Sequence, residues 1–189
     1  MRSSVLEYLE IFGKPSDKPK PDKWRPSVEA DYKINADRSF VPGQHHAGWG
    51  VAVRTADGTL ACARAGRQEH INDAFAVKVI AMSHAIHTAA DLGIVRVELE
   101  TDSQLVAGAL DMHKVDSSTY AAVIEDMKYQ LKLWFSKFTI HVCRRNVNSV
   151  AHELANVVRM CEPNHFMEWE SDVPAHVGEC VLGGLPKHS

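Results

Sequence analysis

The sequence predicts an α/β fold with a five-stranded mixed sheet, in which a three-strand antiparallel meander is followed by βαβ units, with helices on both faces. Three observations lead to this prediction. Polar and apolar residues alternate in the first strand-like segments. An Asp-Gly pair between two such segments is typical of a hairpin turn. Segments with helical spacing then alternate with short β-branched runs. Hydrophobic residues make up 45% of the 189-residue chain, enough to fill a domain core.

The predicted meander occupies the first part of the globular sequence. Residues 31–37 alternate polar and apolar side chains, as a strand does, and residues 48–54 form the second predicted strand. The turn at Asp57-Gly58 leads into a third strand from Leu60 to about Glu69. Three strands that follow one another through short turns pair antiparallel, which gives the meander.

Helices and strands alternate after the meander. Asp73 is a good N-cap for a helix over 74–92, and Gly93 ends that helix. The β-branched residues of 94–100 predict a strand. The remaining predicted elements are helices at 104–113, 120–135 and 148–160 and a strand at 138–142. Helices that connect parallel strands lie across the sheet, so both faces are expected to be covered.

The chain is predicted to have three parts. Residues 1–23 form an N-terminal segment and a Lys/Pro linker, because KPSDKPKPDK at 14–23 has no apolar periodicity. The globular domain is expected over 24–160. Residues 161–189 form a tail punctuated by Pro and Gly, and its apolar residues are expected to pack on the domain.

Charge and hydropathy limit the function classes. The formal net charge is −3, so only local basic clusters can indicate nucleic acid. The sequence shows no apolar run long enough to span a bilayer and no signal peptide. We therefore expect an intracellular protein, in the cytoplasm or nucleus, with no membrane contact. The four cysteines form no CxxC pair and are expected to be ordinary thiols.

Two aspartates suggest a metal site. Asp37 ends the first predicted strand and Asp102 follows the fourth, so the two carboxylates meet at one edge if these strands are neighbours. Oxygen ligands of this kind suit Mg²⁺. A two-metal nuclease holds its ions about 3.5–4 Å apart and usually needs more carboxylates than two. The residues alone also allow Asp102 to be a helix cap and Asp37 a turn residue.

Several segments together resemble a known family. They are 32–37 (YKINAD), 48–51 (GWGV), 98–103 (ELETDS), 148–155 (NSVAHELA) and 169–174 (WESDVP). With the element order, they are similar to the plant, grass-type ribonuclease H-like domains of the retrotransposon-type RNase H type-1 family, from about residue 24 to 186. The resemblance implies a ribonuclease H-like fold. The implied activity is hydrolysis of the RNA strand of an RNA/DNA hybrid with two Mg²⁺ ions.

The resemblance also implies a catalytic set, and this chain departs from it. Asp37 and Asp102 match the family's aspartates and His152 its position in the last helix, but Lys78 stands where the family has Glu. Close unit charges interact by ~4 kcal/mol at 4 Å and an effective dielectric of about 20, so an ammonium here opposes a metal. We therefore expect Mg²⁺ or Mn²⁺ at Asp37 and Asp102 if the protein is active, and no cofactor otherwise. His152 alternatively is a surface histidine without a role.

Basic residues flank the same positions. Arg38 replaces a common Gly and is expected to crowd or contact the scissile phosphate. Arg144, Arg145 and Asn148 precede the last helix and resemble the family's Arg-x-x-Asn loop, which implies phosphate contacts. The alternative is a solvated turn with a cap. Because residues 117–134 contain few Lys, any affinity for nucleic acid is expected to be weak and sensitive to salt.

Two functional hypotheses follow. In the first, the chain is a pseudoenzyme that binds an RNA/DNA hybrid or another nucleic acid, or serves as a protein-interaction module with a protein partner. In the second, it is a working Mg-dependent hybrid ribonuclease that uses Asp37, Asp102 and His152 with an unconventional third ligand. Lys78 distinguishes the two hypotheses and favours the first.

Overall fold

A computed structural model describes residues 23–71, 73–170 and 172–184. The strands are β1 Tyr32–Phe40, β2 His46–Thr55, β3 Leu60–Glu69, β4 Arg96–Thr101, β5 Lys137–Val142 and β6 Phe166–Trp169. The helices are α2 Ala74–Asp91, α3 Gln104–Ala109, α4 Ala121–Trp134, α5 Ser149–Arg159 and α6 Ala175–Gly184. Nearly all of the predicted N-terminal segment, up to residue 22, lies outside the described residues. No helix within the described ranges is long and apolar enough to cross a membrane.

The six strands form one mixed sheet with the order β5-β4-β1-β2-β3-β6. β1, β2, β3 and β6 pair antiparallel, whereas β4 pairs parallel with both β1 and β5. The predicted meander and parallel units are confirmed. The predicted count of five strands is wrong, because residues 166–169 of the tail pair with the outer edge of β3. A strand of four residues has too little alternation to be recognised in the sequence, and the edge of β3 decides where it lies.

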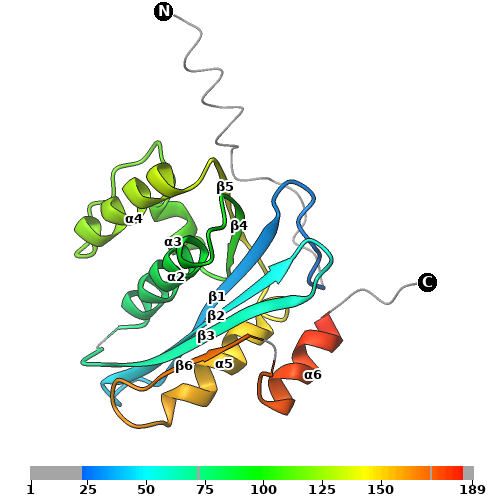
Figure 1. Ribbon diagram of the computed structural model, residues 1–189. Coiled ribbons are helices and arrows are strands. Elements are labelled where there is room, and N and C mark those ends of the chain that lie inside the picture. The colour runs from blue at the N-terminus through cyan, green and yellow to red at the C-terminus, as the bar shows by residue number, and fades with distance from the viewer. Residues whose placement is uncertain (1–22, 72, 171, 185–189) are drawn as a thin grey trace, which may run out of the picture.

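Helices cover both faces of the sheet, as predicted (Figure 1). On one face, Ile34 and Leu99 of the sheet pack in the same core as Met82 of α2, and α3 and α4 lie over this side. On the other face, Ala63 of β3 packs with Leu154 of α5, and Val177 of α6 joins the same core. Apolar side chains that point alternately to the two faces of each strand supply both cores.

The first predicted helix begins where the sequence indicates. The Asp73 carboxylate accepts hydrogen bonds from the backbone N–H groups of Phe75 and Ala76, at 2.8 and 2.9 Å. α3 is shorter than predicted and ends at Ala109, because the following residues form a turn in which Asp111 accepts the backbone N–H of His113. Polar side chains that bond to the local backbone compete with a helix in this way.

Two glycines let α5 lie directly against β2. A Cβ atom added at Gly48 would lie 2.0 Å from the carbonyl oxygen of Ala155, and one at Gly50 would lie 2.2 Å from that of Ala151. Any side chain at these positions therefore clashes with the helix backbone. The contact brings the first turns of α5 close to β1, because Gly50 is paired with Asp37 across the sheet.

Trp24, at the start of the described chain, packs against side chains of β1 and β2. Its side chain is 1% exposed and its indole N–H donates to the Asn35 side chain at 2.9 Å. The guanidinium carbon of Arg54 lies 4.4 Å from the Trp24 ring centroid. Lys33 forms ion pairs with Glu98 and Glu100 beside them, at 2.7 and 3.0 Å. Trp24 thus covers a group of charges that lie on the sheet surface.

Candidate active site

The parallel pairing of β1 with β4 places two aspartates side by side. The last paired residues are Ala36 and Thr101, so Asp37 and Asp102 each come one residue after this pair. The side chains of Asp37 and Asp102 are 3% and 9% exposed. Ser103, rather than Asp102, caps α3, since its hydroxyl accepts the backbone N–H of Val106 at 3.3 Å. The sequence-based alternative of Asp102 as the helix cap is therefore wrong.

Lys78 of α2 is paired with the carboxylate of Asp102. Its ammonium donates a hydrogen bond to Oδ1 of Asp102 and forms an ion pair with it. The side chain of Lys78 is only 14% exposed, so both charges lie mostly out of water. Arg145 adds a second positive charge, with Nε 3.8 Å from Oδ2 of Asp102. Each oxygen of the Asp102 carboxylate therefore faces a cation.

His152 of α5 contacts the other aspartate. Its Nδ1 lies 3.1 Å from Oδ2 of Asp37. The hydrogen bond to Asp37 raises the pKa of His152 above its usual value, and partial burial opposes this rise. The imidazole is 35% exposed, so one side of it still faces solvent. His152 is therefore part of the carboxylate cluster, in contrast to the alternative of an isolated surface histidine.

Arg38 places a further cation near the two aspartates. Burial lowers the pKa of its guanidinium, and the charges of Asp37 and Asp102 act against this fall. Its guanidinium carbon lies 5.6 Å from the centroid of the Phe40 ring. Within the described part of the chain, the Arg38 Nε is buried without a hydrogen-bond partner. Arg38 thus brings to the edge of the site a donor that has no hydrogen-bond partner among the described residues.

The basic loop before α5 divides into surface and buried residues. Arg144 and Arg145 are exposed, and the Arg145 side chain is 78% exposed. Asn148 is completely buried, and its side-chain amide donates to the carbonyl oxygen of Ala36 at 3.0 Å. It makes no side-chain cap for α5 either. Asn148 therefore fixes the loop against β1, and we do not propose it as a contact to nucleic acid.

The residues present do not fit the pair of divalent ions that the resemblance implies. A metal ion at Asp37 and Asp102 would compete with the present partners of these carboxylates, His152 and Lys78. Across the described ranges, no group of three or more His, Cys, Asp or Glu side chains is arranged to hold a metal. The ammonium of Lys78 stands among the would-be ligands and repels a cation.

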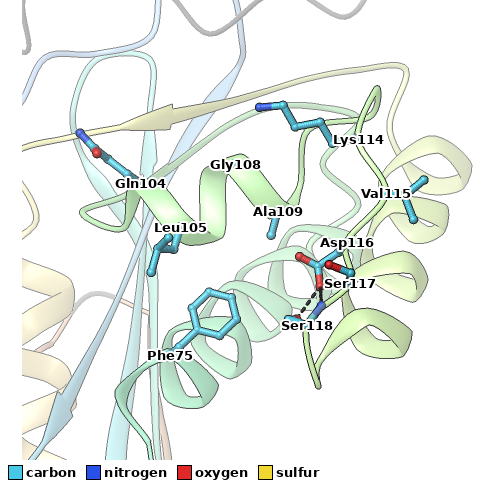
Figure 2. A pocket seen from close by; sticks show the side chains of 10 residues that line it. All are labelled: Phe75, Gln104, Leu105, Gly108, Ala109, Lys114, Val115, Asp116, Ser117 and Ser118. Atoms are coloured by element: carbon cyan, nitrogen blue, oxygen red, sulfur yellow. Dashed lines mark hydrogen bonds between the residues drawn. The ribbon is translucent and has the colours of Figure 1, made fainter.

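A surface pocket is lined by residues that are close in sequence to Lys78 and Asp102, among them Phe75 and Gln104. It has a volume of about 530 Å³ and is formed by the start of α2, by α3 and by the segment before α4 (Figure 2). Figure 2 shows Phe75 and Leu105 on its apolar side and Ser118, hydrogen-bonded to Asp116, on its polar side. Sequence reasoning missed the pocket, because its walls come from three elements whose relative position is set by packing.

Comparisons with known proteins agree on the fold. A model of the reverse transcriptase-like family matches residues 35–158. The N-terminal RNase H domain of a Mycobacterium tuberculosis protein, solved as a fusion with maltose-binding protein, is 20% identical, with a TM-score of 0.60 over 69% of this chain and 94% of that one. RNase H1 from the halophilic archaeon Halobacterium salinarum is 23% identical, with a TM-score of 0.56 over 66% of this chain and 94% of that one.

A third similar structure contains nucleic acid. LC11-RNase H1, solved in complex with an RNA/DNA hybrid, is 19% identical, with a TM-score of 0.59 over 67% of this chain and 95% of that one. At these identities the likeness concerns the fold. A search of the curated proteins gives no match.

Proposed function

Because this chain belongs to the reverse transcriptase-like family, we propose that it is an RNase H-like domain that binds nucleic acid, an RNA/DNA hybrid above all, without cleaving it. The ion pair between Lys78 and Asp102 carries this proposal. In this pair the Lys78 ammonium lies against the Asp102 carboxylate. A metal-dependent nuclease of this fold would need that carboxylate to bind an ion. The surface around the pair still offers cations to a phosphate backbone.

Two features support binding. Arg144 and Arg145 are exposed in the loop before α5, where Arg145 lies 3.8 Å from Asp102, and Arg38 is close to both aspartates. Cations at such positions contact phosphates and give affinity that does not depend on sequence. A structurally similar RNase H1 was solved on an RNA/DNA hybrid, and we extend that ligand class to this chain as part of the proposal. The formal charge of −3 predicts weak affinity that falls as salt rises.

The charges at the site support the loss of cleavage. The resemblance implies a negative set of ligands, whereas here Lys78 and Arg145 face Asp102 and His152 faces Asp37. Placing a divalent ion there means separating a mostly buried ion pair and leaving an ammonium next to the metal. An uncompensated buried charge of this kind costs about 3–5 kcal/mol. The same positions therefore disfavour the Mg²⁺ or Mn²⁺ that an active enzyme would use.

Binding and cleavage are tested on one sample. A hybrid with a labelled RNA strand is mixed with the protein in Mg²⁺ or Mn²⁺ at low salt, and anisotropy and strand length are both recorded. We expect a rise in anisotropy with an intact RNA strand. Robust cleavage that disappears in Asp102→Asn would instead establish the alternative, a hybrid ribonuclease that uses Asp37, Asp102 and His152.

A second candidate function is a protein-interaction module. Apolar side chains on the outer side of α4 favour it, because Tyr129 and Leu133 are 63% and 61% exposed one helical turn apart. If the protein leaves the anisotropy of the hybrid unchanged at low salt, this candidate replaces hybrid binding.

We also propose that the domain derives from the plant, grass-type retrotransposon branch of the family. The segments 98–103 and 148–155 and the tail motif at 169–174 support this origin. We further propose that the folded unit starts near residue 24. A phylogeny in which the chain groups away from plant retrotransposon sequences would remove it.

A further inference from the structure

We propose that Lys78, Arg145 and Arg38 hold a backbone phosphate of the bound nucleic acid directly, so that the site grips the strand without a divalent metal. This inference rests on the proposed function and deepens it, because it names the atoms that take the place of the metal ions. The phosphate of the nucleic acid would contact the same edge of the sheet through side-chain cations.

Side-chain cations gather at this edge of the sheet. Three cations, Lys78, Arg145 and Arg38, surround the two carboxylates of Asp37 and Asp102. His152 adds positive charge whenever it is protonated. Asp73 also acts on Arg38, so three carboxylates lie among these three cations and do not outnumber the positive groups that would meet the single charge of a phosphodiester.

The cations keep hydrogen-bond donors available. An ammonium has three N–H donors, and within the described residues Lys78 uses them for one carboxylate, that of Asp102. Arg145 lies 3.8 Å from Asp102, beyond hydrogen-bond distance, so its planar guanidinium can still form a bidentate contact with a phosphate. Arg38 has a buried Nε without a partner in the described ranges.

Asp102 holds these cations in position before a ligand arrives. The carboxylate contacts Lys78 through one oxygen and faces Arg145 through the other. Lys78 is 14% exposed and forms the floor of the site, whereas Arg145 is 78% exposed and forms its rim. Fixing the floor cation in this way reduces the entropy lost when a phosphate binds. Asp102 thus acts as a positioning residue, in place of a metal ligand.

The first experiment measures hybrid affinity without metal. Anisotropy of a labelled RNA/DNA hybrid is followed with the full chain in EDTA and in Mg²⁺. We expect dissociation constants that agree within about twofold, because the cations are side chains. We expect Lys78→Gln and Arg145→Gln each to raise the dissociation constant by roughly five- to tenfold and to lower the salt slope by about one phosphate contact.

Two further variants control for folding and for general charge. Lys78→Arg keeps a cation at the floor of the site and is expected to retain most of the affinity. Lys132→Gln removes an exposed charge from α4 and is expected to leave the affinity within about twofold of wild type. Loss of binding in EDTA, or equal affinity for Lys78→Gln and Lys132→Gln, would overturn the phosphate site while leaving hybrid binding in place.

A second probe keeps the site testable if the hybrid does not bind. Inorganic pyrophosphate is titrated in EDTA into ¹⁵N-labelled protein, and the side-chain signals of Arg145 and Arg38 and the backbone signal of Lys78 are followed. Saturable shifts confined to these residues would support the site even if hybrid binding, and with it the proposed function, had failed. Absence of shifts would overturn the site.

Discussion

Nδ1 of His152 lies 3.1 Å from Oδ2 of Asp37, across the interface between α5 and β1. The pair exists because α5 lies against the glycines of β2, which places His152 over the neighbouring strand. Asp37 is 3% exposed and His152 is 35% exposed, so the carboxylate is shielded while part of the imidazole faces solvent. The stability of the domain is therefore linked to the protonation of His152.

The first prediction concerns this linkage. Because the hydrogen bond to Asp37 raises the pKa of His152, the pair stabilises the fold fully below about pH 6.5, the ordinary His value. This contribution is lost as the pH rises through the raised pKa. We expect His152→Gln to cost about 0.5–1 kcal/mol at pH 5.5 and less at pH 9, since the ring is partly exposed. Urea unfolding at both pH values measures the difference. An equal loss of stability at both would contradict the linkage.

The second prediction concerns His84, which stacks on Trp49 with ring centroids 3.6 Å apart and planes 9° apart. Burial, with smaller effects from His87 and Arg64, lowers the pKa of His84 to about 4. The unfolded chain binds this proton below about pH 6.5, so stability falls as the pH is lowered from there to about 4, by up to about 3 kcal/mol.

The variant His84→Phe keeps a ring on Trp49 and removes the proton. It should flatten the loss of stability between about pH 6.5 and 4 relative to wild type, as measured by urea unfolding. His113→Phe, at an exposed position, controls for the loss of a histidine. A pH profile of His84→Phe that is parallel to wild type would show that another group causes the acid sensitivity.

The third prediction tests the close approach of α5 to the sheet. A Cβ at Gly50 would lie 2.2 Å from the carbonyl oxygen of Ala151, so Gly50→Ala should lower the free energy of unfolding by about 1–3 kcal/mol. The matched control is Gly108→Ala in α3, where, within the described residues, no atom beyond the chain neighbours and the helix's own backbone lies within 4 Å of the added carbon. A helical Gly→Ala change without a clash should stabilise by about 0.5–1 kcal/mol. Equal effects of both changes would contradict the packing described.

The fourth prediction tests where the folded unit begins. Trp24 is 1% exposed and covers Arg54, so Trp24→Ala should lower the free energy of unfolding by about 3–5 kcal/mol. Val28→Ala, at a residue that is 97% exposed, should change it by less than about 0.5 kcal/mol. A Trp24→Ala effect no larger than that of Val28→Ala would place the domain start further along the sequence.

The sequence predicted most of the fold because its signals are local. The third strand was predicted at its observed limits, 60–69, from the Asp-Gly turn and the strand composition. The cap at Asp73 was also predicted, since a side chain bonding to the next turn is a local interaction. β6 was missed because its position depends on the free edge of β3.

Part of the candidate site could also be predicted from the sequence, because local motifs identify it. Asp37, Asp102 and Lys78 were identified from motif resemblance together with strand order. The contact of Arg145 with Asp102 joins a loop to a distant strand end, and no local pattern indicates it. An Asn in a loop before a helix is typical of a surface contact or a helix cap. The Asn148 side chain is instead buried, and its amide donates to the Ala36 carbonyl. Burial of a polar side chain depends on how helices dock, which spacing does not determine.

If the Lys78 ammonium closes the metal site, the rate of hybrid cleavage in Mg²⁺ depends on the side chain at position 78. Wild type, Lys78→Glu, Lys78→Gln and Asp102→Asn are compared on a hybrid with a labelled RNA strand. We expect wild type, Lys78→Gln and Asp102→Asn to share one background rate, and Lys78→Glu to rise at least tenfold above it, because the carboxylate removes the cation and adds a ligand. A wild-type rate above background that is lost in Asp102→Asn would show that Lys78 does not close the site.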